Sequence, residues 1–223
     1  MKDKILVVAV HPDDETLGCG GTLLKHRANG DEIHWMLVTS VLENQGFSAD
    51  DVLLREKQIQ AVGRAYRFSG IHRLDIPTTK VDEISISQLV EKIAAVIKSV
   101  KPTVVYLPFF ADVHSDHKRI FEAAFSCTKS FRYPFIRRVL MMETISETEF
   151  APSVGSNAFV PNVIVDVSKF MDQKVKIMKL YKTEIKDRPF PRSIDNITAL
   201  GTFRGGMGGC KYAESFMLLK EIG

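Results

Sequence analysis

Hydrophobic residues in this chain recur at two different spacings, and the switching between them most limits what the chain can fold into. A continuous, β-branched run at Lys4–Val10 is typical of a strand buried on both faces, whereas the pattern over Asp13–Asn29 is typical of a helix. Strand-like and helix-like runs alternate through most of the chain. Chains that alternate in this way form parallel sheets covered by helices. The sequence therefore predicts an α/β, Rossmann-like fold with a mostly parallel sheet flanked by helices.

Capping residues indicate where the predicted helices begin. Asp50 and Asp51 are expected to cap a helix that extends to Tyr66, and Ser168 is expected to cap one that extends to Tyr181. Further helices are expected between 85 and 101 and over 115–128, and further strands over 32–39, 73–76, 103–107, 137–143 and 162–167.

The last third of the chain has a less regular pattern. Pro189 and Pro191 interrupt the segment that follows the last predicted helix, and six of the 14 glycines lie between positions 201 and 223. We therefore expect a single domain over residues 1–223 that ends in a C-terminal elaboration.

Charge and composition exclude several classes of function. Lys and Arg exceed Asp and Glu by only 30 to 27, without a run of five basic residues, so no nucleic-acid partner is expected. The longest apolar run, Ile5–Val10, has six residues, whereas a membrane span needs roughly 20. Three widely spaced cysteines do not suggest a disulfide framework, and the first ten residues do not resemble a signal peptide. We expect a cytoplasmic protein without a membrane span, and a homo-oligomer is compatible with the sequence.

Ionisable residues concentrate directly after two predicted strands. The first segment, His11–Glu15, contains one His and three acidic residues, and the second, His114–His117, contains two His and one Asp. Ligands of open parallel sheets bind beyond the carboxyl ends of the strands, so these segments are expected to meet in one crevice. Either segment alone is compatible with polar residues that only cap an element. The two together predict a functional site.

The residue types in these segments favour a bound divalent metal. Residues three apart at the start of a helix project to the same side, so His11 with Asp14 and His114 with His117 each form a two-point clamp. The adjacent carboxylates of Asp13 and Asp14 repel one another unless a cation offsets them. Two His and one carboxylate leave coordination positions open, as catalytic zinc and Fe(II) sites do.

These motifs resemble the LmbE-like, or PIG-L-type, metal-dependent N-deacetylases. The resemblance rests on segments throughout the chain: Ala9–Glu15, His114–His117, Glu143–Glu149, Pro191–Ser193, Arg204 and Gly208–Phe216. It implies an enzyme that hydrolyses an N-acetylglucosaminyl or related N-acetylhexosamine compound to acetate and a free amino sugar. The implied partner is thus a small amino-sugar molecule, and the implied cofactor is Zn²⁺, with Fe²⁺ as the alternative.

The resemblance also implies residue roles. The implied metal ligands are His11, Asp14 and His117. The implied catalytic residues are Asp13, as general base, His114, and Asp116, which would orient His114 and raise its pKa. The implied substrate-binding residues are Arg55, Arg192 and Arg204. The residues are also compatible with two other functions. The protein could be a metal-dependent hydrolase that acts on a phosphoester or a non-sugar amide, or a non-catalytic protein that binds a sugar nucleotide.

Overall fold

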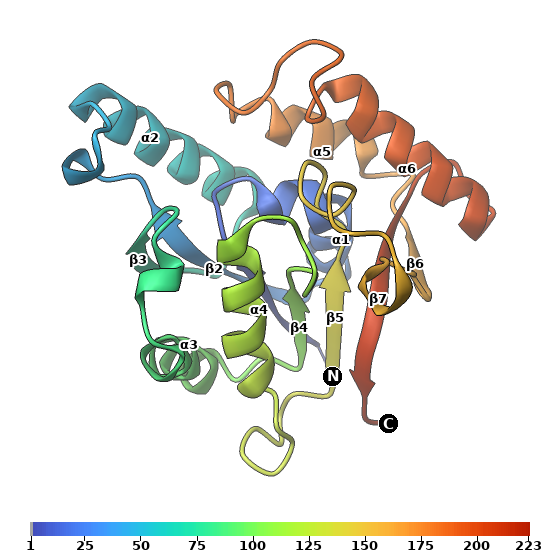
Figure 1. Cartoon of the computed structure of the whole chain (residues 1–223). Helices are drawn as coiled ribbons and strands as arrows, with labels where there is room; N and C mark the ends of the chain where they lie inside the picture. The colour runs from blue at the N-terminus through green and yellow to red at the C-terminus, as the bar shows by residue number, and fades with distance from the viewer. Residues whose placement is uncertain (1) are drawn as a thin grey trace.

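The computed structural model describes residues 2–223, and the strands of this part of the chain form one seven-stranded sheet (Figure 1). The strand order is β3-β2-β1-β4-β5-β7-β6. The first five strands of this order are parallel, and β7 is antiparallel to both its neighbours. In chain order the strands are β1 (Lys4–Ala9), β2 (Glu32–Ser40), β3 (Gly70–Pro77), β4 (Val104–Leu107), β5 (Arg138–Met142), β6 (Val163–Asp166) and β7 (Ala213–Glu221). The prediction of a mostly parallel α/β sheet is confirmed.

Side chains of β1 alternate between two hydrophobic cores, which explains its continuous apolar run. Ile5 and Val7 belong to one core, and Leu6 and Val8 belong to the other. All four are fully buried, since helices cover both faces of the sheet.

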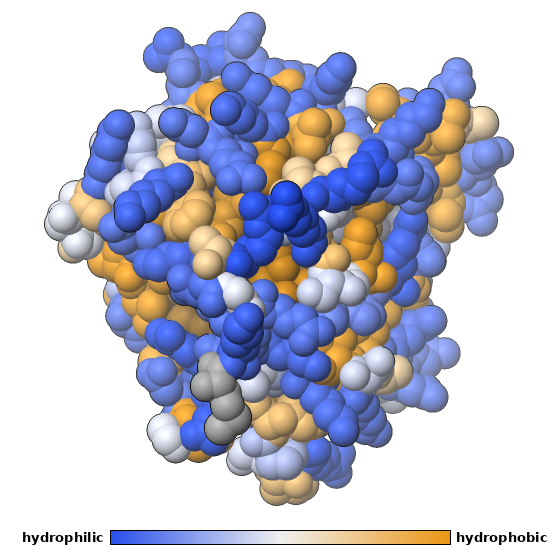
Figure 2. All heavy atoms as spheres, turned by 180° about the vertical axis from the view of Figure 1, so that it is seen from behind, coloured by the Kyte–Doolittle hydropathy of each residue, from blue (hydrophilic) through white to orange (hydrophobic). Residues whose placement is uncertain are grey.

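Six helices in the described chain cover the two faces of the sheet. They are α1 (Asp14–Asn29), α2 (Ala49–Tyr66), α3 (Ile86–Val100), α4 (Ser115–Ser126), α5 (Met171–Met178) and α6 (Ile194–Gly208). Buried side chains of α1, α2, α5 and α6 join the first core, and those of α3 and α4 join the second. Figure 2 shows that hydrophilic side chains dominate the outer surface seen from behind. Among the described residues, no helix combines the length and apolar character needed to cross a membrane.

Two of the predicted helix starts are wrong. α2 is capped by Ser48, whose hydroxyl accepts the Asp51 N–H while the Asp51 carboxylate accepts the Ser48 N–H. Asp51 is thus the third residue of the helix and not its cap. α5 begins at Met171, because the Ser168 hydroxyl donates to Asp166 and does not cap the helix.

The C-terminal elaboration is more regular than the sequence pattern suggests. The glycine-rich stretch forms most of α6, and β7 then pairs between β5 and β6 (Figure 1). Gly205 is needed for close packing within the helix and does not mark a loop. A Cβ at this position would lie only 2.6 Å from the Cys210 carbonyl oxygen.

Candidate active site

The candidate site forms where the order of the strands reverses. β1 and β4 lie side by side in the sheet. The next strand beyond β1 is β2, and the next strand beyond β4 is β5, so the chain continues in opposite directions from this point. In open α/β sheets, ligands bind in the crevice that opens at such a reversal, beyond the carboxyl ends of the strands. Side chains from 11–14, after β1, and 114–117, after β4, contact one another there. The expected meeting of the two segments is therefore observed.

Three side chains bring one ligand atom each to a common point. His117 Nε2 lies 3.3 Å from His11 Nδ1 and 3.4 Å from Asp14 Oδ2. His11 Nδ1 and Asp14 Oδ2 are 4.0 Å apart. These three residues form one of the two groups in the described chain whose atoms are close enough to hold a metal ion, the other being His11, His114 and Asp116.

Two carboxylates behind this cluster determine which imidazole nitrogens face it. Asp116 Oδ2 lies 3.2 Å from His11 Nε2, and Asp112 Oδ2 lies 2.8 Å from His117 Nδ1. A carboxylate only accepts, so each neutral ring carries its proton on the nitrogen nearest its Asp. The lone pairs of His11 Nδ1 and His117 Nε2 then point at the Asp14 carboxylate and at each other. With both rings neutral, three acceptors converge on one point, so the residues fit a divalent metal.

The electrostatics of the cluster agree with this conclusion. Burial disfavours the charged form of Asp14, but His117 outweighs it and lowers the pKa of Asp14 to about 2. Burial also lowers the pKa of His117, but Asp14 and Asp112 outweigh it and raise that pKa well above its usual value. Asp14 is thus ionised at neutral pH, as a ligand must be, and the position of His117 favours positive charge.

Asp112 is a site residue that the sequence motifs did not single out. Its carboxylate is fully buried and also accepts a 2.7 Å hydrogen bond from the Thr148 hydroxyl. The only signal in the sequence is its position five residues before His117. Because Thr148 lies after β5, the pairing that fixes Asp112 exists only in the folded protein.

We expect Asp112→Ala to weaken metal binding by about 10–100-fold, because His117 loses the carboxylate that fixes its ring and proton. Titration of the metal-free protein with zinc measures this. Asp31→Ala is the matched control, since Asp31 pairs with His26 at 2.7 Å outside the site. Equal zinc affinities for the two variants would contradict the role of Asp112.

Asp13 lies beside the cluster in an unusual backbone conformation. Its φ is 132° and ψ is −25°, which in a residue other than glycine costs about 1–3 kcal/mol. Its carboxylate is buried and contacts Arg192 Nη1 at 3.2 Å. Burial and the charge of Asp14 raise the pKa of Asp13 well above its ordinary value, while Arg192 acts in the opposite direction. Asp13 is therefore a stronger base than an exposed Asp.

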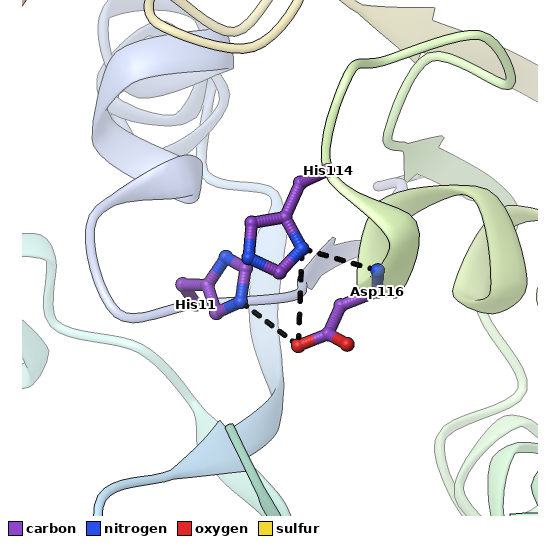
Figure 3. A group of neighbouring side chains, drawn as sticks. All are labelled: His11, His114 and Asp116. Atoms are coloured by element: carbon purple, nitrogen blue, oxygen red, sulfur yellow. Dashed lines mark hydrogen bonds and ion pairs between the residues drawn. The ribbon is translucent and has the colours of Figure 1, made fainter. Parts of the chain in front are cut away.

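His114 and Asp116 are arranged differently from the expectation (Figure 3). His114 Nδ1 accepts the Asp116 backbone N–H at 3.1 Å, so the neutral ring carries its proton on Nε2. The Asp116 carboxylate lies 3.2 Å from His11 but 4.0 Å from His114. Burial and the nearby His11 lower the pKa of His114, outweighing the opposite effect of Asp116. Asp116 thus acts on the pKa of His114 in the expected direction, but the net shift is downward. Its backbone N–H orients His114, whereas its carboxylate orients His11.

A cavity of about 370 Å³ opens over these residues. Arg55 and Arg192 line it, as expected, and both pair with Glu184. Arg204 does not line this cavity: its guanidinium pairs with Glu143 at 2.6 Å and faces a different cavity. The structure thus brings two of the three predicted Arg residues to the site.

Glu147 and Glu184 also line the cavity, and sequence analysis assigned neither a role. Burial raises the pKa of Glu147 to about 7, and its Oε2 is buried without a hydrogen-bond partner. Glu184 holds both Arg side chains, which lower its pKa against the effect of burial. Glu147 lies within the Glu143–Glu149 segment of the family resemblance, whereas Glu184 lies outside those segments and contacts Arg side chains from distant parts of the sequence.

Comparison with known proteins assigns the chain to a family. Residues 6–128 match the family described as PIG-L, GlcNAc-PI de-N-acetylase, and these are more than half of the 223 residues. The chain belongs to the PIG-L family. The predicted resemblance to PIG-L-type enzymes is confirmed, and the matched region contains His11, Asp14 and His117.

Relatives of this PIG-L protein match nearly its whole length. Diacetylchitobiose deacetylase of Thermococcus kodakarensis is 24% identical over 229 residues, which cover 98% of this chain and 84% of that protein. The conserved protein TT1542 of Thermus thermophilus has a TM-score of 0.77 at 24% identity, covering 99% and 96% of the two chains. N,N′-diacetylchitobiose deacetylase of Pyrococcus horikoshii has a TM-score of 0.76 at 20% identity, covering 98% and 84%. The solved structures share the fold of this chain.

Proposed function

We propose that this PIG-L enzyme hydrolyses the N-acetyl group of an N-acetylglucosaminyl or related N-acetylhexosamine compound, with zinc as its metal and residues 1–223 acting as one domain. The observation that carries the proposal is the convergence of His11, Asp14 and His117 beside Asp13, next to a cavity that His11, Asp13 and Asp14 line. The deacetylase relatives, which are named for an N-acetylated sugar, support this substrate class.

The metal would be held by His11 Nδ1, Asp14 Oδ2 and His117 Nε2. When bound, a divalent metal polarises an acyl oxygen and acidifies water. Asp112 and Asp116 orient the two imidazole rings, so that His117 Nε2 and His11 Nδ1 face the metal position.

Asp13 acts as the general base. Its carboxylate takes a proton from the water that attacks the acetamide carbon, and Arg192 holds that carboxylate in place. The C–N bond then breaks, and the products are acetate and the free amine.

Asp13 also returns the proton to the leaving nitrogen. His114 is not the acid in this proposal, because its Nδ1 accepts a backbone N–H and its pKa is lowered. Its remaining Nε2–H is a hydrogen-bond donor for the acyl oxygen as negative charge develops there. Arg55 and Arg192 contact the sugar from the rim of the cavity, and Arg204 does not.

Acetate release tests the proposed function. The protein is assayed with N-acetylglucosamine linked to a sugar, a nucleotide or an inositol, before and after chelation. We expect acetate from at least one compound, a fall of about 100-fold or more after chelation, and recovery with one equivalent of zinc. Recovery of activity with Fe²⁺ but not with zinc would show that the metal is iron and not zinc. A release of phosphate instead of acetate would favour the phosphoesterase alternative, and binding without turnover would favour the non-catalytic one.

A further inference from the structure

One buried carboxylate next to the site has no part in the proposed chemistry. Glu15 is completely inaccessible to solvent, although it directly follows Asp13 and Asp14. Its Oε2 accepts the Asp13 backbone N–H at 3.2 Å. Its Oε1 accepts the hydroxyls of Thr16, at 2.6 Å, and Tyr181, at 2.9 Å. Three donors on two oxygens match an acceptor-only carboxylate.

The hydrogen bond to Asp13 coincides with the strained backbone. The Asp13 carbonyl is held by the N–H groups of Thr16 and Leu17, at 2.9 and 2.8 Å. Its N–H contacts Glu15, so the Asp13 residue is fixed on both sides at a φ of 132°. Without the Glu15 acceptor, a buried N–H would lose its partner and the strain would favour relaxation of the backbone.

Glu15 is itself anchored by elements outside α1. Tyr181, which follows α5, donates to it directly. Tyr66, at the end of α2, donates at 3.1 Å to the Thr16 hydroxyl that binds Glu15. Both Tyr residues are fully buried. The first turn of α1 is thereby tied to two other parts of the fold.

We propose that Glu15 is a positioning residue, whose carboxylate holds the Asp13 backbone in its strained conformation and so aims the Asp13 carboxylate at the reacting water. This rests on the proposed role of Asp13 as the general base. Glu15 belongs neither to the candidate metal-binding groups nor to the residues that line the cavity, so its effect passes through Asp13.

The test compares Glu15→Met, which keeps the volume but removes the acceptor, with Glu15→Gln, which keeps an acceptor for the Asp13 N–H. We expect Glu15→Met to lower kcat by about 30–100-fold, since misplacing a catalytic group by about 1 Å can cost 100-fold. KM and one bound zinc per chain should be retained. We expect Glu15→Gln to keep kcat within about fivefold, because the Thr16 and Tyr181 hydroxyls can rotate to accept from its amide. If Glu15→Met fails to fold, Tyr181→Phe replaces it, with an expected fall in kcat of about threefold to tenfold at unchanged KM.

Glu214→Gln is the matched control. Glu214 is a second buried carboxylate on the backbone of α1, where it accepts the N–H groups of Gly21 and Thr22 and pairs with Lys174. This variant should lower the melting temperature but leave kcat unchanged. A kcat that falls as much in Glu214→Gln as in Glu15→Met would show a general effect of destabilising α1 and overturn the proposal.

A crystal structure of metal-free Glu15→Met separates this inference from the proposed function. We expect the φ of Asp13 to leave the region near 132°. An unchanged Asp13 backbone, or an unchanged kcat in Glu15→Met or its Tyr181→Phe replacement, would overturn the positioning role. If the unmodified protein releases no acetate, the proposed function fails, and the Asp13 backbone still decides whether Glu15 holds it.

Discussion

Asp13→Ala is expected to lower kcat for acetate release by about 10²–10⁴-fold, the range typical for loss of a positioned general base, while one zinc per chain stays bound. The metal stays because the Asp13 carboxylate contacts Arg192 and is outside the group of three ligand atoms. Acetate release and metal content are measured on the same samples, with the substrate that the unmodified enzyme turns over best.

Glu122→Ala is the control for losing a carboxylate that pairs with Arg. Glu122 contacts Arg119 at 2.8 Å on α4, outside the site, and its removal should leave kcat unchanged. If metal-loaded Asp13→Ala kept more than about a tenth of the unmodified kcat, its loss would be smaller than general-base catalysis supplies, and another base would be required.

His117→Ala should have the second large effect, and it should differ in kind. His117 is fully buried, and its Nε2 is within 3.4 Å of both other ligand atoms. Its loss leaves Asp14 and Asp112 without their shared partner. We expect the variant to fold but to lose its zinc on dialysis. Its loss of zinc affinity should exceed the loss of about 10–100-fold expected for Asp112→Ala.

His26→Ala is the control for this variant, because His26 pairs with Asp31 as His117 pairs with Asp112 but lies outside the site. It should retain one zinc per chain. One tightly bound zinc in His117→Ala would mean that the ligand set is different, with the group of His11, His114 and Asp116 as the alternative.

The sequence predicted six of the seven strands because hydrophobic spacing is a local property, and it missed β7. The fully buried run of β1 and the helix that follows it are visible from neighbouring residues alone. α6 was missed for the same reason. Its glycines suggest a loop locally, but Gly205 is required by the close approach of the Cys210 backbone, which local pattern cannot reveal.

The candidate site also has a part that the sequence predicted and a part that it did not. The meeting of segments 11–15 and 114–117 could be predicted because each follows a strand, and parallel strands end at a common edge. The choice of His11, Asp14 and His117 as ligands within these segments came from the family resemblance. Their partners could not be predicted. The Asp116 carboxylate turns to His11, 105 positions away, and Arg204 turns to Glu143 instead of the cavity.

The sequence by itself determined the alternation of strands and helices, the edge of the sheet where the chemistry lies, and the residue types that fit a divalent metal. Only the tertiary structure decided which imidazole nitrogens converge with the Asp14 carboxylate, which carboxylates lie behind the two rings, and that Glu15 accepts the Asp13 N–H. The physical reason is one of range. Periodicity and strand ends depend on neighbouring residues, whereas protonation states and hydrogen bonds depend on side chains that only folding brings within about 3 Å of one another.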